Sequence, residues 1–257
     1  MRVALLQTKL DAKSRAANIQ GLIAAIHRAA DTDPAPDLLV LPGGCDTGGA
    51  AADRGLSEPV SQTVRETIAF KAREWGVYIA AGFHVQRDDV WVPSAVLFDP
   101  DADVVAIGVQ QTDNDAESAP PALFWSCALG RIGVFEPSAS SLPPDVDSLG
   151  TEGAFIALPT GLAMTTKRRR AGKENVASLR DDSSVRGGAY WGVVSPAGAQ
   201  KGSPDKNGPA TFVCSPNGKL LAAADTVEET IVFADVPLDP VLPRAWTGRV
   251  NCDGQAD

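Results

Sequence analysis

The chain has 257 residues, of which 44% are hydrophobic, and it is therefore long enough to bury a core without disulfide bonds. Its net charge of −9 argues against nucleic acid and anionic membranes as main partners, because both select basic surfaces. Two histidines and four scattered cysteines, with no C-x-x-C spacing, predict neither a metal site nor a cofactor.

No stretch of the sequence reaches the roughly 18 apolar residues that a membrane span needs. The first residues also lack the length and the cleavage site of a signal peptide. We therefore expect a cytoplasmic protein with reduced cysteines.

The first third of the chain predicts strands that alternate with helices. Residues 2–7 are a short apolar run, and apolar residues at three- and four-residue spacing indicate an amphipathic helix over about 12–31. The run 37–42 is almost wholly apolar, as is typical of a strand buried on both faces. A second helix is expected over 61–75, with Gly76 ending it.

The remaining elements follow as a meander, a central pair of strands and a late hairpin. The predicted elements are strands at 77–82, 90–98 and 104–109, paired strands at 123–129 and 131–135, a weak helix at 142–153, a buried strand at 154–158, a helix at 176–188, a strand at 191–195, a hairpin of 211–215 with 219–224, and a last strand at 230–236. No repeat or internal boundary is apparent. We expect one domain over 1–240 and a tail at 241–257 without a periodic pattern.

Five short segments, in this order, carry a family resemblance. They are the first strand with Gln7, the strand Leu39-Val40-Leu41-Pro42, the strand and turn at 94–100, the strand Arg131-Ile132-Gly133-Val134, and the hairpin at 212–222. Together they resemble the nitrilase (carbon–nitrogen hydrolase) superfamily, and the resemblance covers nearly the whole chain. It implies an α/β fold, a four-layer α-β-β-α sandwich of the nitrilase type.

The resemblance also implies three catalytic positions, and none of them holds the family's residue. The family uses a glutamate after the second strand as base, a lysine after the meander to stabilise the oxyanion, and a cysteine nucleophile after the Gly-Arg-Ile-Gly-Val strand. In this chain these positions are Gly43, Gln111 and Pro137. Shifting the comparison by a few residues restores none of the three residue types.

Other residues near these positions complete the vestigial pocket that the resemblance predicts: Gly44, Cys45, Glu117 and Ser138. Cys45 is the only cysteine near the expected pocket, and Glu117 lies in an acidic loop where the family often keeps an additional glutamate. Ser138 follows the central strand, but a serine nucleophile needs a base. His84 is expected at a strand end far along the sheet, too distant for that role.

Two functions are compatible with this pattern. The first is a catalytically inactive family member, a pseudoenzyme, that serves as a binding, scaffolding or regulatory subunit. Its partners would be a second copy of itself or an active nitrilase-like paralogue, together with a small-molecule ligand. The alternative is an amide or carbamoyl (carbon–nitrogen) hydrolase that recruits Cys45, Asp46 or Glu117.

Overall fold

The computed structural model describes residues 1–11, 14–46, 58–87, 90–109, 124–135, 153–157, 190–198, 211–216, 219–225 and 228–237. In chain order, the elements are β1 (Arg2–Gln7), α1 (Arg15–Ala30), β2 (Leu38–Val40), α2 (Glu58–Trp75), β3 (Tyr78–Arg87), β4 (Val90–Phe98), β5 (Val104–Val109), β6 (Phe124–Cys127), β7 (Gly130–Phe135), β8 (Gly153–Ala157), β9 (Tyr190–Val193), β10 (Phe212–Cys214), β11 (Leu220–Ala223) and β12 (Thr230–Asp235).

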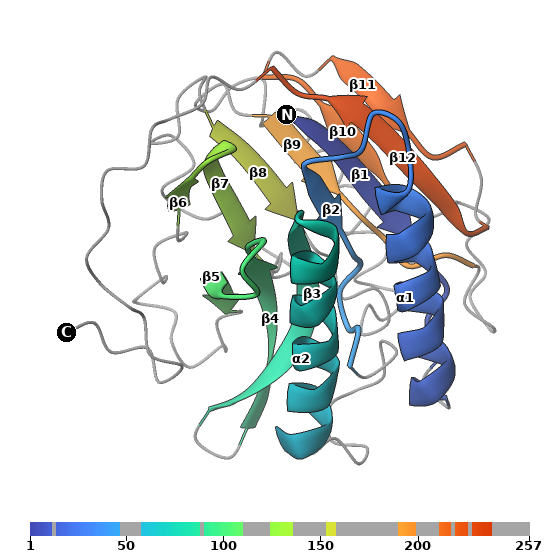
Figure 1. Cartoon of the computed structure of the whole chain (residues 1–257), viewed down its shortest axis with the longest axis vertical. Helices are drawn as coiled ribbons and strands as arrows, with labels where there is room; N and C mark the ends of the chain where they lie inside the picture. Colours follow the sequence, from blue (N-terminus) through green and yellow to red (C-terminus); the bar gives the residue numbers. More distant parts are fainter. Residues whose placement is uncertain are drawn as a thin grey trace, which may run out of the picture.

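These strands form two six-stranded sheets (Figure 1). The first sheet has the order β12-β1-β2-β3-β4-β5, and the second has the order β11-β10-β9-β8-β7-β6. Each sheet contains three neighbouring parallel strands, β1-β2-β3 in the first and β7-β8-β9 in the second. Antiparallel strands flank them on both sides.

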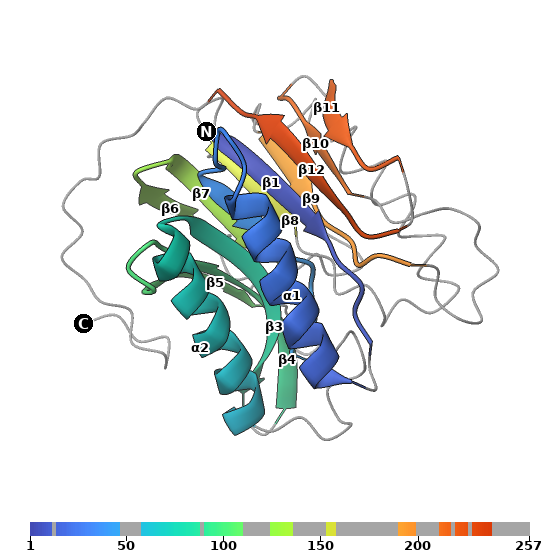
Figure 2. The same cartoon turned by 45° about the vertical axis from the view of Figure 1, so that its right-hand side comes forward.

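The first sheet packs between two apolar layers, one on each face. One lies between the sheets and joins residues such as Leu5, Val40 and Ala80 to Ile132 and Val213 of the second sheet. The other lies between the first sheet and the helices α1 and α2, which run side by side over its outer face (Figure 2). The alternation of side chains along each strand separates the two layers, since successive residues point to opposite faces.

Local sequence signals explain where the helices begin and end. The side chain of Ser14 accepts a hydrogen bond from the Ala17 N–H, and it therefore caps the first turn of α1. Gly76 follows α2 with a φ of 64°, a left-handed conformation that glycine adopts without strain. Neither helix in the described part of the chain is long and apolar enough to cross a membrane.

The observed elements confirm most of the predicted ones, with one consequential difference. The meander, the central strand pair and the late hairpin are present. However, β3 does not end at Gly82 but continues to Arg87, because its backbone pairs with β4 as far as Val90. The predicted helices at 142–153 and 176–188 fall on residues outside the described part, apart from Gly153, which begins β8. The tail at 241–257 also lies outside it.

Candidate functional site

The segment that follows β2 is the part of the expected pocket that the structure describes. Residues 41–46 continue beside β3 as an irregular extension of the parallel pair. The Leu41 N–H donates to the Ala80 carbonyl at 2.8 Å, and the Cys45 N–H donates to the Gly82 carbonyl at 2.9 Å. The segment therefore lies at the carboxyl edge of β1, β2 and β3, an edge that often binds ligands in sheets of this kind.

Glycine is required where this segment crosses β3. A Cβ atom added to Gly82 would lie 2.4 Å from the Cα atom of Gly43. Gly44 has a φ of 72°, which is strained for any residue with a side chain. Gly43, the residue at the expected base position, thus brings only backbone to this edge and has no carboxylate.

Cys45 is a buried structural residue in this arrangement. Its side chain is 1% exposed, and its Sγ donates to the Pro42 carbonyl at 3.1 Å. Burial, and then the charge of Asp46, raise the pKa of the Cys45 thiol far above its ordinary value. The thiolate is the nucleophilic form of cysteine, so these surroundings do not support the recruitment of Cys45 as a nucleophile.

Three buried polar side chains, the Asp46 cluster, lie next to Cys45. Asp46 and Ser61 have no exposed surface, and His84 is 5% exposed. One carboxylate oxygen of Asp46, Oδ1, is 3.0 Å from Nδ1 of His84, and the other, Oδ2, accepts from the His84 backbone N–H at 2.7 Å. Ser61 Oγ lies 3.0 Å from Asp46 Oδ2 and 3.0 Å from the His84 carbonyl oxygen.

The position of His84 corrects the expectation from sequence. His84 was expected at a strand end far along the sheet, but it lies within β3, directly beside the segment that follows β2. The reason is the length of β3. Because this strand continues past the end of β2, its backbone groups at His84 lack a strand partner on that side. The Asp46 carboxylate and the Ser61 hydroxyl take the place of the missing strand.

The Asp46 cluster does not have the hydrogen-bond order of a Ser-His-Asp triad. In such a triad the serine hydroxyl donates to the histidine ring. Here the Ser61 hydroxyl faces the carboxylate of Asp46 and the backbone carbonyl of His84 instead. Sequence spacing could not have revealed the cluster, since its members come from a loop, a helix and a strand. The one available signal was a polar residue, Asp46, close after a buried strand.

The other candidate residues fall outside the described part of the chain: Gln111, Glu117, Pro137 and Ser138. The strands that precede two of them are described. Val109, the last residue of β5, pairs with Ser94 of β4. Ser94 in turn pairs with Phe83 of β3, the residue before His84. The strand β7, which ends at Phe135, packs against β4 and β5. Within the described residues, no group of three or more His, Cys, Asp or Glu side chains could hold a metal ion.

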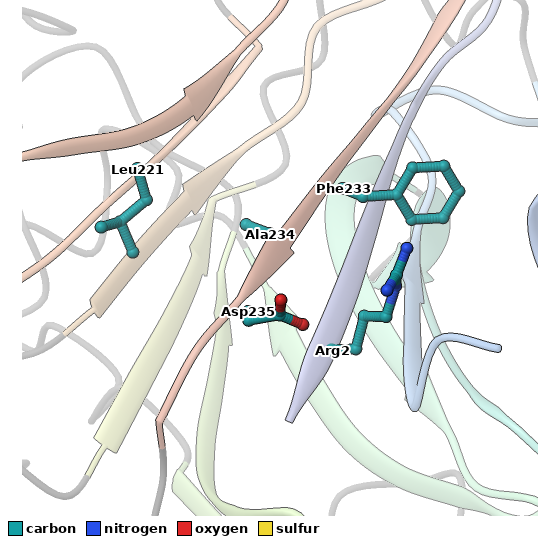
Figure 3. Close-up of a pocket in the computed structure, with 5 residues that line it drawn as sticks. All are labelled: Arg2, Leu221, Phe233, Ala234 and Asp235. Carbon is teal, nitrogen blue, oxygen red and sulfur yellow. The ribbon is translucent and has the colours of Figure 1, made fainter. Parts of the chain in front are cut away.

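A separate cavity of about 410 Å³ lies at the amino-terminal end of β1, away from the Asp46 cluster (Figure 3). It is lined by Arg2, Leu221, Phe233, Ala234 and Asp235. The Arg2 guanidinium lies 5.1 Å from the centre of the Phe233 ring. Arg2 lies at the amino-terminal end of β1, whereas Asp46 lies beyond the carboxyl end of the neighbouring strand β2. This cavity is therefore not part of the expected pocket.

Solved structures of an amidase from Nesterenkonia sp. AN1 are similar to this chain over almost its whole length. A variant described as an amidase from the nitrilase superfamily matches with a TM-score of 0.72 and 18% identity, covering 92% of this chain and 92% of that chain. Another variant, which carries the acetamide moiety of fluoroacetamide at its active site cysteine, matches with a TM-score of 0.73 and 18% identity, covering 92% and 90%. An amidase from Nesterenkonia sp. matches with a TM-score of 0.72 and 17% identity, covering 93% and 91%.

No protein-family model and no curated protein matches the sequence. The structural similarity covers at least nine-tenths of both chains in each of these comparisons. A likeness at this level of identity establishes architecture and not activity. The chain has the fold of the nitrilase-superfamily amidases.

Proposed function

We propose that this protein is a catalytically inactive member of the nitrilase superfamily that acts as a binding, scaffolding or regulatory subunit. The observation that carries the proposal is Gly43. The fold supplies the loop that follows β2, but the position expected for the general base has no side chain, and the Gly43 backbone packs against Gly82. A cysteine without a base is only a few per cent ionised near neutral pH.

The neighbouring carboxylate does not replace the missing one. Asp46 is fully buried, and both of its oxygens already accept hydrogen bonds from His84 and Ser61. Turning this carboxylate toward a substrate would leave buried N–H groups without acceptors, at a cost of about 1–3 kcal/mol for each group. These hydrogen bonds support a structural role for Asp46 rather than a catalytic one.

The other two expected catalytic positions, Pro137 and Gln111, also lack the residue types of the family. The similar amidase from Nesterenkonia sp. AN1 reacts at an active site cysteine, whereas the position aligned with the family's cysteine in this chain is Pro137. Proline has no nucleophilic side chain. Gln111 offers only a neutral donor in place of a lysine, and losing such a stabiliser typically lowers the rate by a factor on the order of 10² to 10³.

Hydrolysis of simple amides, with mass spectrometry to detect an acyl-enzyme, tests the proposal. Wild type and Pro137→Cys are expected to show neither turnover nor an acyl adduct, because Gly43 cannot activate a thiol. The matched variant combines Pro137→Cys with Gly43→Glu and Gln111→Lys, and restores all three functional groups at once. The three changes act on one chemical step, so their effects should not add independently.

Wild-type turnover would contradict the proposal and favour the alternative, a carbon–nitrogen hydrolase with non-standard residues. The same assay on Cys45→Ser then shows whether Cys45 is the nucleophile. Turnover that persists in Cys45→Ser together with a covalent acyl adduct would show that the active site lies elsewhere. Turnover that disappears would assign the nucleophile to Cys45.

A further inference from the structure

The cavity at the amino-terminal end of β1 is lined by two opposite charges that do not pair with each other. Arg2 and Asp235 are directly opposite in the antiparallel pairing of β1 with β12, and both line the cavity. Opposite charges at such cross-strand positions commonly attract each other. The ion pairs among the described residues nevertheless include neither of them. In Figure 3 the Arg2 guanidinium turns toward the Phe233 ring, apart from the Asp235 carboxylate.

The contact with the Phe233 ring restrains the Arg2 guanidinium and leaves its donors without acceptors. The guanidinium carbon lies 5.1 Å from the ring centre, and a cation over an aromatic face is attracted to the ring. The Nε atom of Arg2 is buried and has no hydrogen-bond partner among the described residues. A guanidinium stays protonated and presents its N–H groups as a fork that matches the two oxygens of a carboxylate. A ligand with paired oxygens would therefore be favoured at this side chain.

Two carboxylates flank Arg2 and disfavour a ligand that is only an anion. Asp235 lines the cavity beside Arg2, and the Asp37 carboxylate accepts a hydrogen bond from the Arg2 backbone N–H at 2.6 Å. Both aspartates are exposed. A purely anionic ligand would meet one positive and two negative charges here. A ligand that also carries an ammonium group would be attracted by Asp235 as well as by Arg2.

The other lining residues of the cavity are apolar: Leu221, Phe233 and Ala234. Leu221 is 39% exposed, so an apolar ligand group that covers it would remove apolar surface from water. The cavity volume of about 410 Å³ lies within the range of small-molecule sites, roughly 300–1,000 Å³. The cavity therefore suits a small ligand that combines two opposite charges with an apolar group.

We propose that this cavity binds a small zwitterion with an apolar side chain, of which the free amino acid leucine is an example. The carboxylate of the ligand binds the Arg2 guanidinium, its ammonium group faces the Asp235 carboxylate, and its alkyl group covers Leu221. The proposal goes beyond the proposed function and does not depend on it, because the cavity lies away from Gly43 and the Asp46 cluster. A catalytically active chain would bind the zwitterion equally well.

Titration calorimetry of the purified full chain with three probes of similar shape tests the proposal. Leucine carries both charges, isocaproate keeps only the carboxylate, and isopentylammonium keeps only the ammonium group. We expect saturable binding of leucine, and an affinity for each singly charged probe that is lower by about tenfold or more, because each forms only one of the two charged contacts. No saturable binding of leucine, or equal affinities for the three probes, would overturn the proposal.

Variants of Arg2 test whether the ligand occupies this cavity. Arg2→Gln should weaken leucine binding by about tenfold or more. Arg2→Lys should recover only part of the affinity, because an ammonium group lacks the planar fork of a guanidinium. The matched control, Arg28→Gln, replaces an exposed arginine on α1 and should leave the affinity unchanged. Leucine binding that persists unchanged in Arg2→Gln would place the ligand elsewhere and overturn the proposal.

Asp235→Asn separates the two charged contacts and also decides the question if Arg2→Gln fails to fold, since Asp235 is an exposed residue. The variant should bind leucine more weakly than wild type does, because the ammonium group loses its counter-charge. Isocaproate has no ammonium group, so it should bind the variant at least as well as it binds wild type. Unchanged leucine affinity in Asp235→Asn, or an equal loss for leucine and isocaproate, would contradict the proposed orientation and overturn the proposal.

Discussion

Asp46 is the residue on which the described half of the site depends. Its carboxylate completes the hydrogen bonding of β3 beyond the end of β2 and orients the imidazole of His84. It also faces the hydroxyl of Ser61 near the start of α2. One side chain therefore connects a loop, a strand and a helix. Hydrogen bonds to a charged group contribute more than neutral ones, about 1.5–3 kcal/mol each.

Replacing Asp46 should destabilise the protein far more than replacing an exposed aspartate. In Asp46→Asn, one carboxylate oxygen becomes an NH₂ group that meets a donor, and we expect a loss of about 2–4 kcal/mol in the free energy of unfolding. Urea denaturation measures it. The matched control, Asp225→Asn, lies on an exposed residue and should change the free energy by less than about 0.5 kcal/mol. Equal effects in the two variants would contradict a structural role for Asp46.

The Cys45 thiol should make the protein less stable at alkaline pH. Its pKa is raised in the folded state, whereas the unfolded thiol has a pKa of about 8.5. The folded protein thus keeps a proton that the unfolded chain loses. The stability gained is fully present below about pH 8.5 and is lost as the pH rises above it, by up to about 1.4 kcal/mol per pH unit.

Cys45→Ser tests this dependence, because serine keeps a donor for the Pro42 carbonyl and does not ionise in this range. The free energy of unfolding, measured by urea denaturation between about pH 8 and pH 10, should fall less steeply in the variant. In addition, iodoacetamide should alkylate Cys45 only after unfolding. Rapid alkylation of the native thiol would show that it is accessible and reactive.

At the scale of elements, the site depends on how closely β3 approaches the segment after β2. The backbone of Gly43 occupies the space into which a side chain at Gly82 would point. This contact lets the loop cross the strand and return, so that the Cys45 N–H still reaches the Gly82 carbonyl. The glycine pair therefore determines where Asp46 meets β3.

Gly82→Ala should destabilise the protein by about 1–3 kcal/mol, because the added methyl group has no space without a backbone shift. The control is Gly21→Ala in α1, where an added Cβ would meet nothing within 4 Å. In a helix interior, that substitution should stabilise by about 0.5–1 kcal/mol. Thermal unfolding of the two variants measures the difference. A neutral Gly82→Ala would show that the approach of the two segments is looser than the structure indicates.

At the level of the whole molecule, exposed apolar side chains are candidate contacts for association. The described residues expose four large apolar side chains: Phe70, Val104, Leu220 and Leu221. Phe70 lies on α2, where the Lys71 and Arg73 cations are each 5.7 Å from its ring centre.

We expect a homodimer or a hetero-oligomer with an active paralogue, as the subunit role requires. Light scattering coupled to size-exclusion chromatography at micromolar concentration measures the mass of the purified chain. A mass twice that of one chain would support self-association. A clean monomer that also fails to bind a nitrilase-like partner would contradict the expectation.

The sequence alone was enough to predict the order of the elements, and the family resemblance predicts that the catalytic residue types are missing at Gly43, Gln111 and Pro137. Both follow from local information: the periodicity of apolar residues reports which face of a strand or helix is buried, and the residue at a position such as Gly43 or Pro137 is read directly. The resemblance of five short segments to the nitrilase superfamily predicted two packed sheets of the nitrilase type, and the structural similarity confirms this fold.

The surroundings of the expected pocket depend on tertiary packing. Asp46 and His84 are 38 residues apart, and Ser61 lies 15 residues from Asp46, with no pattern that links them. They meet because β3 pairs with β4 beyond the end of β2, and its unpaired backbone groups require partners in a buried place. Sequence pattern records which face of an element is apolar, but the partners of a buried polar group depend on how separate elements pack together.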